Sequence, residues 1–314
     1  MTADLTEPAI RLPLSKRQGR GKSPKSIAIV NAAVEILREI QPASVRAVCY
    51  RLFIQNLIPA MSKNHTNAVS TQLVWAREQG YIAWEWIVDE TREAERITTW
   101  NSAEEIIEAA VRGYRQNYWS EQPEWIEIWS EKGTVRGTLA PVLDKYGVTF
   151  RVMHGYGSAT ALHSIAEETQ GSDKTLEVLY AGDWDPSGMH MSEVDLPARL
   201  DRYGADACIA RIALNKADVL HGDLPSFEAV TKQGDTRYQW FVERYGCRCW
   251  ELDALSPVIL RERVEVEIVA RLDVDSWNHS MKIEAAERES MQGILRVWPS
   301  ISRQAQKYSE DELP

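Results

Sequence analysis

The chain has 314 residues, of which 44% are hydrophobic and 26% are charged, as is typical of a folded globular protein. This length predicts two packed units rather than one. The formal net charge of −10 argues against a protein that coats DNA by bulk electrostatics, because phosphate neutralisation needs clustered Lys and Arg. The four cysteines are too few for a disulfide scaffold, and no second pair at zinc-ligand spacing accompanies Cys247 and Cys249.

The opening segment carries basic residues before any hydrophobic periodicity begins: Arg11, Lys16, Arg17, Arg20, Lys22 and Lys25. We expect residues 1–24 to form a flexible basic tail, which either contacts DNA or only keeps the chain soluble. No stretch approaches the roughly 20 consecutive apolar residues of a membrane span, and the N-terminus lacks the charged-then-apolar order of a secretory signal. The expectation is a cytoplasmic, nucleoid-associated protein with no membrane partner.

Residues 25–98 are predicted to form three helices followed by a β-element. Apolar residues recur at helical spacing over residues 26–40, and Pro42 stops that helix. Ser44 can cap a second helix over residues 45–54, and a third begins near Asn64 and ends at Gly80. Residues 81–88 alternate as a strand or hairpin does. This order is that of a winged-helix domain.

The third of these helices is the one that a winged-helix domain offers to the major groove of DNA. Over residues 64–77 its polar side chains include the candidate DNA contacts His65, Asn67, Ser70 and Gln72. Many winged helices bind protein instead, so the fold alone does not decide the partner.

An α/β pattern follows a charged connector that runs into a helix over residues 103–114. Strands are predicted at residues 125–129, 148–154, 175–180 and 207–214, and helices at residues 134–146, 158–168 and 189–199. Such alternation predicts a mostly parallel, Rossmann-like sheet covered on both faces, within a domain of residues 99–255 that includes the linker helix. Residues 255–303 are mostly helical in pattern, and residues 256–314 form a C-terminal helical extension.

Acidic residues follow two of these strands. Glu131 comes after the first strand, and Asp183 and Asp185 come after the third. Ligands of open α/β sheets collect at the carboxyl ends of the strands, and residues i and i+2 of extended backbone face the same way. Carboxylates held together favour a hard cation such as Mg²⁺. The alternative is an acidic turn, with Pro186 and Gly188 as turn residues and an aspartate capping the next helix.

A family resemblance rests on three strings: Glu131-Lys132-Gly133, HGYGS at residues 154–158, and DWDPSG at residues 183–188. Together they look like the Toprim domain of the topoisomerase VI A subunit and of its eukaryotic relative, the transesterase that makes meiotic double-strand breaks. The chain is similar to an orphan bacterial or plasmid-type homologue over about residues 27–255. This resemblance implies Mg²⁺ ligation by Glu131, Asp183 and Asp185.

The same family carries a nucleophilic tyrosine in its winged helix, in a string like R-x-x-Y-Y. Here Arg46 and Tyr50 match that string, and Cys49 replaces its first aromatic residue. Arg46 and Tyr50 lie four apart on one helix face, where the guanidinium can hold the scissile phosphate or favour the phenolate. A free phenol has a pKa near 10, so the nucleophile needs activation. The alternative is a core or groove-lining aromatic residue beside Leu52 and Phe53.

The resemblance implies a type IIB topoisomerase A-subunit-like enzyme. Tyr50 attacks double-stranded DNA and forms a 5′-phosphotyrosyl link, with assistance from Arg46 and Lys132. In the family the tyrosine of one protomer meets the metal domain of its partner, which implies a homodimer. The chain contains no ATPase motif, so it either uses a separate ATPase partner for strand passage or only breaks DNA.

Two other functions stay open from the sequence. The first is a Toprim nuclease that cuts with metal-activated water, and the second is a non-catalytic winged-helix DNA-binding protein. Residues 250–257 resemble a segment downstream of Toprim in bacterial and plasmid-borne relatives, which would put Glu251 or Asp253 near the metal. A strand-to-helix turn explains that segment equally well, so neither residue joins the predicted catalytic set.

Overall fold

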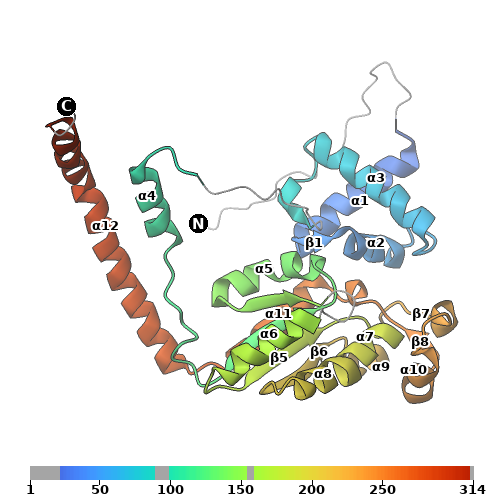
Figure 1. Cartoon of the computed structure of the whole chain (residues 1–314). Coiled ribbons are helices and arrows are strands. Elements are labelled where there is room, and N and C mark those ends of the chain that lie inside the picture. Colours follow the sequence, from blue (N-terminus) through green and yellow to red (C-terminus); the bar gives the residue numbers. More distant parts are fainter. Residues whose placement is uncertain (1–21, 89–98, 154–158, 312–314) are drawn as a thin grey trace, which may run out of the picture. The chain divides into compact units, whose positions relative to one another are not determined.

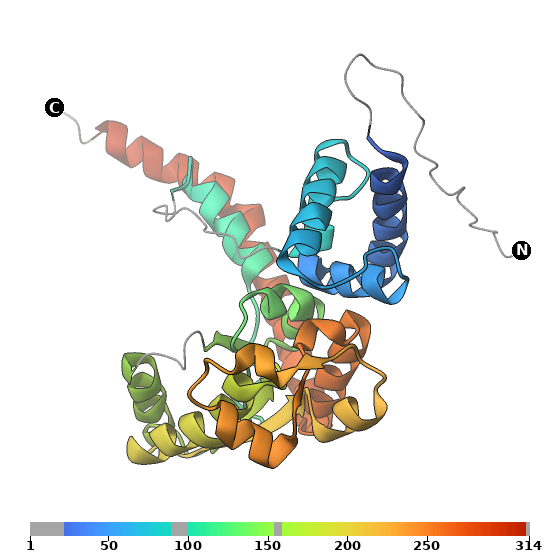
Figure 2. The same cartoon turned by 90° about the vertical axis from the view of Figure 1, so that its right-hand side faces the viewer.

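A computed structural model describes residues 22–88, 99–153 and 159–311 of the chain. Most of the predicted basic tail and residues 154–158 of the HGYGS string lie outside the described residues. The described residues fall into two compact units (Figures 1 and 2). The first comprises those up to Glu90 together with Ile126–Ile268, and the second comprises those of Thr91–Trp125 and Val269–Pro314.

Three packed helices open the first unit, as the sequence predicted: α1 (Pro24–Ile40), α2 (Val45–Ile54) and α3 (Lys63–Glu78). The side chains of Ser23 and Ser44 accept hydrogen bonds from backbone N–H groups of the first turns of α1 and α2, which satisfies donors that a helix start leaves unpaired. Their apolar stripes share one core, which includes Val30, Leu37, Val48, Leu52, Val69 and Leu73.

The predicted strand over residues 81–88 is wrong over most of its length. A 3₁₀ turn, Trp84–Trp86 (η1), precedes a strand of two residues, β2 (Ile87–Val88), which pairs in parallel with β1 (Ala43–Ser44). The Arg77 guanidinium lies over the Trp84 ring and donates to the Trp84 carbonyl oxygen at 2.8 Å. The alternating pattern predicted a strand of eight residues. β1 has only two residues with which this segment pairs, so the paired part is short.

The centre of the first unit is a four-stranded parallel sheet in the order β4-β3-β5-β6 (Figure 1). Its strands are β3 (Trp125–Ser130), β4 (Thr149–Val152), β5 (Leu176–Ala181) and β6 (Ala207–Ala213). Between them run α5 (Thr134–Tyr146) and α6 (Ala159–Gln170). The predicted α/β class is therefore confirmed. The two central strands, β3 and β5, are almost wholly buried, as expected where both faces of a sheet are covered.

A bent helical segment joins β5 to β6, where the sequence predicted one helix. It consists of α7 (Pro186–His190), a π-helical turn η3 (Met191–Asp195) and α8 (Leu196–Arg202). The Ser192 hydroxyl donates to the carbonyl oxygen of Gly188 at 3.1 Å, inside the helical ladder. Such π turns occur often at functional sites, and this one follows the acidic string directly.

Residues beyond β6, for which the sequence analysis predicted no elements up to residue 254, return to the carboxyl edge of the sheet. They form α9 (Lys216–His221), β7 (Phe227–Glu228), η4 (Ala229–Lys232), α10 (Tyr238–Tyr245), β8 (Arg248–Cys249) and η5 (Leu252–Ala254). Backbone hydrogen bonds of 2.9 and 3.0 Å join Trp184 to Trp250. This bridge holds residues 250–254 against the acidic string. The helix α11 (Pro257–Val269) follows.

The second unit is mainly a pair of helices, α4 (Ala103–Gly113) and α12 (Val274–Asp311). These two helices contact each other, and Arg288 of α12 donates to the carbonyl oxygen of Tyr114 at 2.6 Å (Figure 2). The predicted helix over residues 103–114 and the helical C-terminal stretch are confirmed. Across the described ranges, no helix has the length and apolar character needed to span a membrane.

Candidate active site

The three predicted carboxylates come together at the carboxyl edge of the sheet. Glu131 follows β3 and Asp183 follows β5, so that the charge of Asp183 acts on the Glu131 carboxyl. Burial raises the pKa of Glu131 to about 7, and the negative charges of Asp183 and Asp185 act in the same direction. With a pKa of about 7, Glu131 is protonated in roughly half of the molecules at neutral pH, mainly because its carboxyl group is buried.

Asp183 is the most firmly held of the three. It is buried, and its Oδ1 accepts hydrogen bonds from Lys132 Nζ at 2.9 Å and from the backbone N–H of Leu252 at 2.8 Å. Burial by itself would raise the pKa of Asp183, but the positive charge of Lys132 and the Leu252 N–H outweigh it and hold the pKa below its usual value. Asp183 is therefore ionised and fixed in direction.

Asp185 caps the helix that follows it, which is the structural role that the sequence left as an alternative. Its Oδ1 accepts from the N–H of Gly188 at 2.8 Å, and its Oδ2 lies 3.1 Å from Lys232 Nζ. Gly188 is required here, because an added Cβ would collide with the Asp183 carbonyl oxygen. Asp185 caps α7 and pairs with Lys232, and it is buried as Asp183 is. Its structural role is therefore compatible with a place in the site.

A partly buried arginine outside the predicted site holds the acidic string in place. Arg211 extends from β6 and donates to the carbonyl oxygens of Gly182, Asp183, Gly188 and Leu214 at 2.8–3.1 Å. Burial lowers its pKa, but the guanidinium still carries its charge among these carbonyl dipoles. An arginine inside an otherwise apolar strand is the sequence signal that would have found it.

Lys132 connects the carboxylates to the segment that follows β8. Its Nζ lies 2.9 Å from Asp183 Oδ1 and 3.1 Å from Asp253 Oδ2, and Ser44 donates to the other oxygen of Asp253. Burial would lower the pKa of Lys132, but the charges of Asp183 and Asp253 raise it above its usual value. Lys132, predicted as a catalytic residue, is thus a permanent cation between two aspartates.

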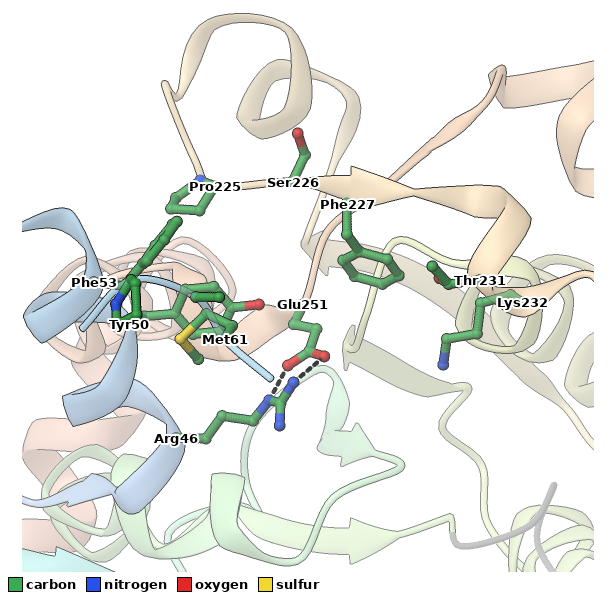
Figure 3. A pocket seen from close by; sticks show the side chains of 12 residues that line it. Arg46, Tyr50, Phe53, Met61, Pro225, Ser226, Phe227, Thr231, Lys232 and Glu251 are labelled. Carbon is green, nitrogen blue, oxygen red and sulfur yellow. Dashed lines mark hydrogen bonds and ion pairs between the residues drawn. The ribbon is translucent and has the colours of Figure 1, made fainter. Parts of the chain in front are cut away.

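Arg46 and Tyr50 lie on α2, and Arg46 makes a two-pronged ion pair with Glu251 (Figure 3). Burial would lower the pKa of Arg46, but Glu251 raises it. The guanidinium lies 6.0 Å from the centre of the Tyr50 ring. The group that the sequence assigned to a phosphate is therefore held by a carboxylate.

Tyr50 is buried, with 3% of its surface exposed. Burial is the main cause that raises the pKa of its phenol, the charge of Glu251 raises it further, and Arg46 opposes both. The arrangement therefore makes Tyr50 a poorer nucleophile than a free tyrosine. An attack by Tyr50 requires that the balance between Arg46 and Glu251 change.

A pocket of about 470 Å³ lies beside Tyr50. Figure 3 shows the Tyr50 hydroxyl and the Glu251 carboxylate facing its interior, with Lys232 farther along. Lys232 lines this pocket and also pairs with Asp185, so one side chain joins the pocket to the carboxylates. The remaining lining residues include Phe53, Pro59, Ala60, Met61, Pro225, Ser226, Phe227 and Thr231.

The four predicted DNA-contact residues lie on α3 and do not line this pocket. His65 Nδ1 is 2.8 Å from the hydroxyl of Ser62, and Gln72 accepts from Lys22 Nζ at 2.6 Å. Asn67 is exposed and Ser70 is partly exposed. Asn67 and Ser70 are three apart and share a side of α3, whereas His65 and Gln72 face another.

The carboxylates fit Mg²⁺ in their chemistry, since they offer hard oxygens and their mutual repulsion already favours a proton on Glu131. In the ranges that the structure describes, however, no group of three or more His, Cys, Asp or Glu side chains is spaced to hold a metal ion. Lys132 and Lys232 form ion pairs with Asp183 and Asp185. A cation bound by these carboxylates would take over the charge neutralisation that the two lysines now provide.

Three side chains outside the predicted catalytic and metal-binding residues complete the site: Lys232, Glu251 and Asp253. The first lies in no motif, and the other two had a turn as an equal explanation. Each acts on a partner far away in the sequence, such as Arg46 for Glu251 and Lys132 for Asp253. Comparison with known proteins found no protein-family model and no curated protein that matches this chain.

Proposed function

We propose that this protein cleaves double-stranded DNA by Mg²⁺-dependent tyrosine transesterification, with an N-terminal winged-helix domain and a Toprim-like metal domain. The observation that carries the proposal is the shared pocket. Tyr50, Arg46 and Lys232 line it together, and Lys232 is bonded to the carboxylate of Asp185. A nucleophile, two phosphate-binding cations and a carboxylate cluster are thus adjacent within one unit.

In the proposed reaction the Tyr50 oxygen bonds to the phosphorus of a backbone phosphodiester, and the bond from phosphorus to the 3′-oxygen breaks. The phenol proton passes to Glu251 or to water, and the departing 3′-oxygen is protonated. Arg46 and Lys232 hold the negative oxygens of the phosphate, and Lys132 adds positive charge at the carboxylates. The products are a 5′-phosphotyrosyl link and a free 3′-hydroxyl group.

Glu131, Asp183 and Asp185 would hold the Mg²⁺, and a bound ion supplies positive charge that stabilises the phosphate and the leaving oxygen. Arg211 fixes the backbone carbonyl group of Asp183, and the cap on α7 fixes the carboxylate of Asp185. A second copy of the chain and a separate ATPase remain part of the proposal, as the family resemblance implies.

Arg46 must exchange one anion for another in this scheme. Its two-pronged contact with Glu251 has the geometry that a guanidinium also uses for phosphate. When a phosphate replaces Glu251, its own negative charge takes the place of the Glu251 charge beside the phenol of Tyr50. Arg46 and Lys232 then hold the phosphate, and Glu251, released from Arg46, can accept the phenol proton.

A second function is supported by the burial of Tyr50. A phenol with a raised pKa suits a packing residue better than a nucleophile. In this alternative the same carboxylates serve a nuclease in which water attacks the phosphate, and Tyr50 only shapes the pocket.

The deciding experiment incubates purified protein with supercoiled plasmid and Mg²⁺, stops the reaction with detergent, and compares gels run with and without proteinase. We expect linear DNA whose ends stay protein-bound until proteolysis. Tyr50→Phe and Asp183→Asn should each abolish both the cut and the adduct. Tyr81→Phe is the matched control, because Tyr81 lies in the same domain against Trp75 and does not line the pocket.

Free DNA ends produced equally by Tyr50→Phe would replace transesterification with metal-assisted hydrolysis. Cutting that survives Asp183→Asn would contradict both metal-dependent schemes. No cutting by the wild-type protein, on relaxed or supercoiled plasmid, would reject DNA cleavage by this chain alone.

A further inference from the structure

We infer that the pocket beside Tyr50 receives a single unstacked nucleotide of a DNA strand, next to the phosphate that is cut. The base lies among the apolar side chains and the phosphate lies at the cations. This inference rests on the proposed function, since it names the form of DNA that the same site takes.

The apolar walls of the pocket come from two separate segments. Phe53 lies in the last turn of α2 and Met61 lies in the loop that follows this helix, whereas Phe227 belongs to β7. Figure 3 shows Phe53, Tyr50 and Met61 on one side of the view and Phe227 with Lys232 on the other. Aromatic side chains are platforms on which any base can stack, because every base has a π-face.

The polar part of the pocket carries two cations. Arg46 is 40% and Lys232 is 43% exposed at the side chain, so a ligand can reach both. Ser226, Thr231 and the carboxylate residue Glu251 also line the pocket, and the Ser226 hydroxyl accepts a hydrogen bond from Arg248. Stacking rings and phosphate-binding cations within one pocket are the two elements that recognise a nucleotide rather than a purely apolar molecule.

The size of the pocket selects one nucleotide and excludes stacked duplex. About 470 Å³ is within the range of sites for one small ligand, roughly 300–1,000 Å³. Contacts to duplex phosphates require only surface cations and would leave the apolar walls without an occupant. A base that enters this pocket must therefore leave the helix stack, as in enzymes that act on extruded bases.

Unstacking is easiest in single strands and at flexible pyrimidine–purine steps. We therefore expect the protein to bind a short single-stranded oligodeoxynucleotide more tightly than the matching duplex. Cleavage of duplex should favour sites at which one strand opens readily.

The test measures fluorescence anisotropy of a labelled short single-stranded oligodeoxynucleotide with the full-length protein in EDTA, so that no cutting occurs. Phe227→Leu keeps an apolar side chain but removes the ring, and Lys232→Met removes the charge at a partly exposed position. Each should weaken binding about tenfold, the size expected for one stacked base or one phosphate contact. Lys216→Met, on the exposed start of α9 outside the pocket, is the matched control and should bind as wild type does.

A competition experiment distinguishes binding of the base from binding of the phosphate. A deoxynucleoside monophosphate should displace the oligonucleotide at concentrations at which inorganic phosphate does not. Equal displacement by inorganic phosphate would show that the base contributes nothing, and undiminished binding by Phe227→Leu would exclude the pocket as the base site. Either result overturns the inference.

The outcomes also separate this inference from the proposed function. Tyr50→Phe should keep oligonucleotide binding while losing plasmid cleavage. Wild-type cleavage together with unchanged binding by Phe227→Leu rejects the nucleotide pocket and leaves the cleavage proposal intact. Pocket-dependent binding without any cleavage rejects the cleavage proposal and leaves the nucleotide pocket intact.

Discussion

The edge of the sheet and helix α2 hold the two halves of the site in different ways. At the sheet edge, Asp183 accepts from a lysine and a backbone N–H, and Arg211 ties its carbonyl oxygen to three others. On α2, Arg46 depends on one acidic side chain, Glu251. Backbone groups therefore make most of the contacts at the sheet edge, whereas Arg46 on α2 is held by one ion pair between side chains.

This difference separates what is rigid from what can respond to substrate. Backbone partners at the sheet edge stay in place as long as the fold is intact, whereas the Arg46–Glu251 pair depends on two side chains, of which Arg46 is 40% exposed. The fold therefore fixes the carboxylates, and under the proposed function only the surroundings of Tyr50 change when a substrate binds. Substitutions at four positions test this contrast, and they are given in decreasing order of their predicted effect.

Arg211→Met should lower the free energy of unfolding by about 3 kcal/mol, because it removes the guanidinium hydrogen bonds to four carbonyl oxygens around the acidic string. Chemical denaturation monitored by circular dichroism measures the loss. Arg202→Met, at the exposed end of α8, is the control and should change stability by less than about 0.5 kcal/mol. Equal stability of the two variants would contradict the view that Arg211 organises the acidic string.

Glu251→Gln should lower the pKa of the Tyr50 phenol, because one of the charges that raise this pKa disappears while Arg46 remains. NMR of ring-labelled tyrosine against pH follows the titration, and Tyr50→Phe assigns the resonance. Glu228→Gln, on the exposed side of β7, should leave the titration unchanged. A rise in the pKa after Glu251→Gln would mean that Glu251 mainly keeps Arg46 in place.

Two substitutions of Asp185 separate its cap from its charge. Asp185→Ala removes both and should cost about 1 kcal/mol in stability through the lost cap on α7. Asp185→Asn keeps a good capping side chain and should recover most of that loss, since Asn and Asp cap equally well. Thermal unfolding compares the two. Isothermal titration with Mn²⁺ should show weaker binding in both variants, and wild-type affinity in Asp185→Asn would remove Asp185 from the ligand set.

Asn67→Ala should change stability least, by less than about 0.5 kcal/mol, because Asn67 is exposed on α3. Its effect should appear in the affinity for duplex DNA, with a loss of roughly tenfold if α3 lies in the major groove. Filter binding at fixed salt measures this. Gln292→Ala on the exposed side of α12 is the control, and equal affinity of both variants would exclude Asn67 as a DNA contact.

Local sequence patterns predicted the parts of the fold that depend on neighbouring residues. Apolar spacing and the Ser44 cap predicted the N-terminal helices, although Ser23 rather than Ser26 caps the first of them, and the alternation of strands and helices predicted the parallel sheet with acidic residues at its edge. These features follow from interactions within a few residues, so a local pattern is enough to find them. The strand over residues 81–88 failed because pairing depends on a partner strand that the local pattern does not contain.

The contacts between polar and charged side chains of the site depend on the tertiary structure. Ser44 and Asp253 are 209 residues apart, and Arg46 and Glu251 are 205 apart, yet both pairs form at one edge of the sheet. Lys232 reaches Asp185 from a turn that no periodic pattern predicts. Tyr50 is buried, and the charge of Glu251 raises the pKa of its phenol while Arg46 lowers it. This state follows from these distant partners and from the contact between α2 and the segment after β8.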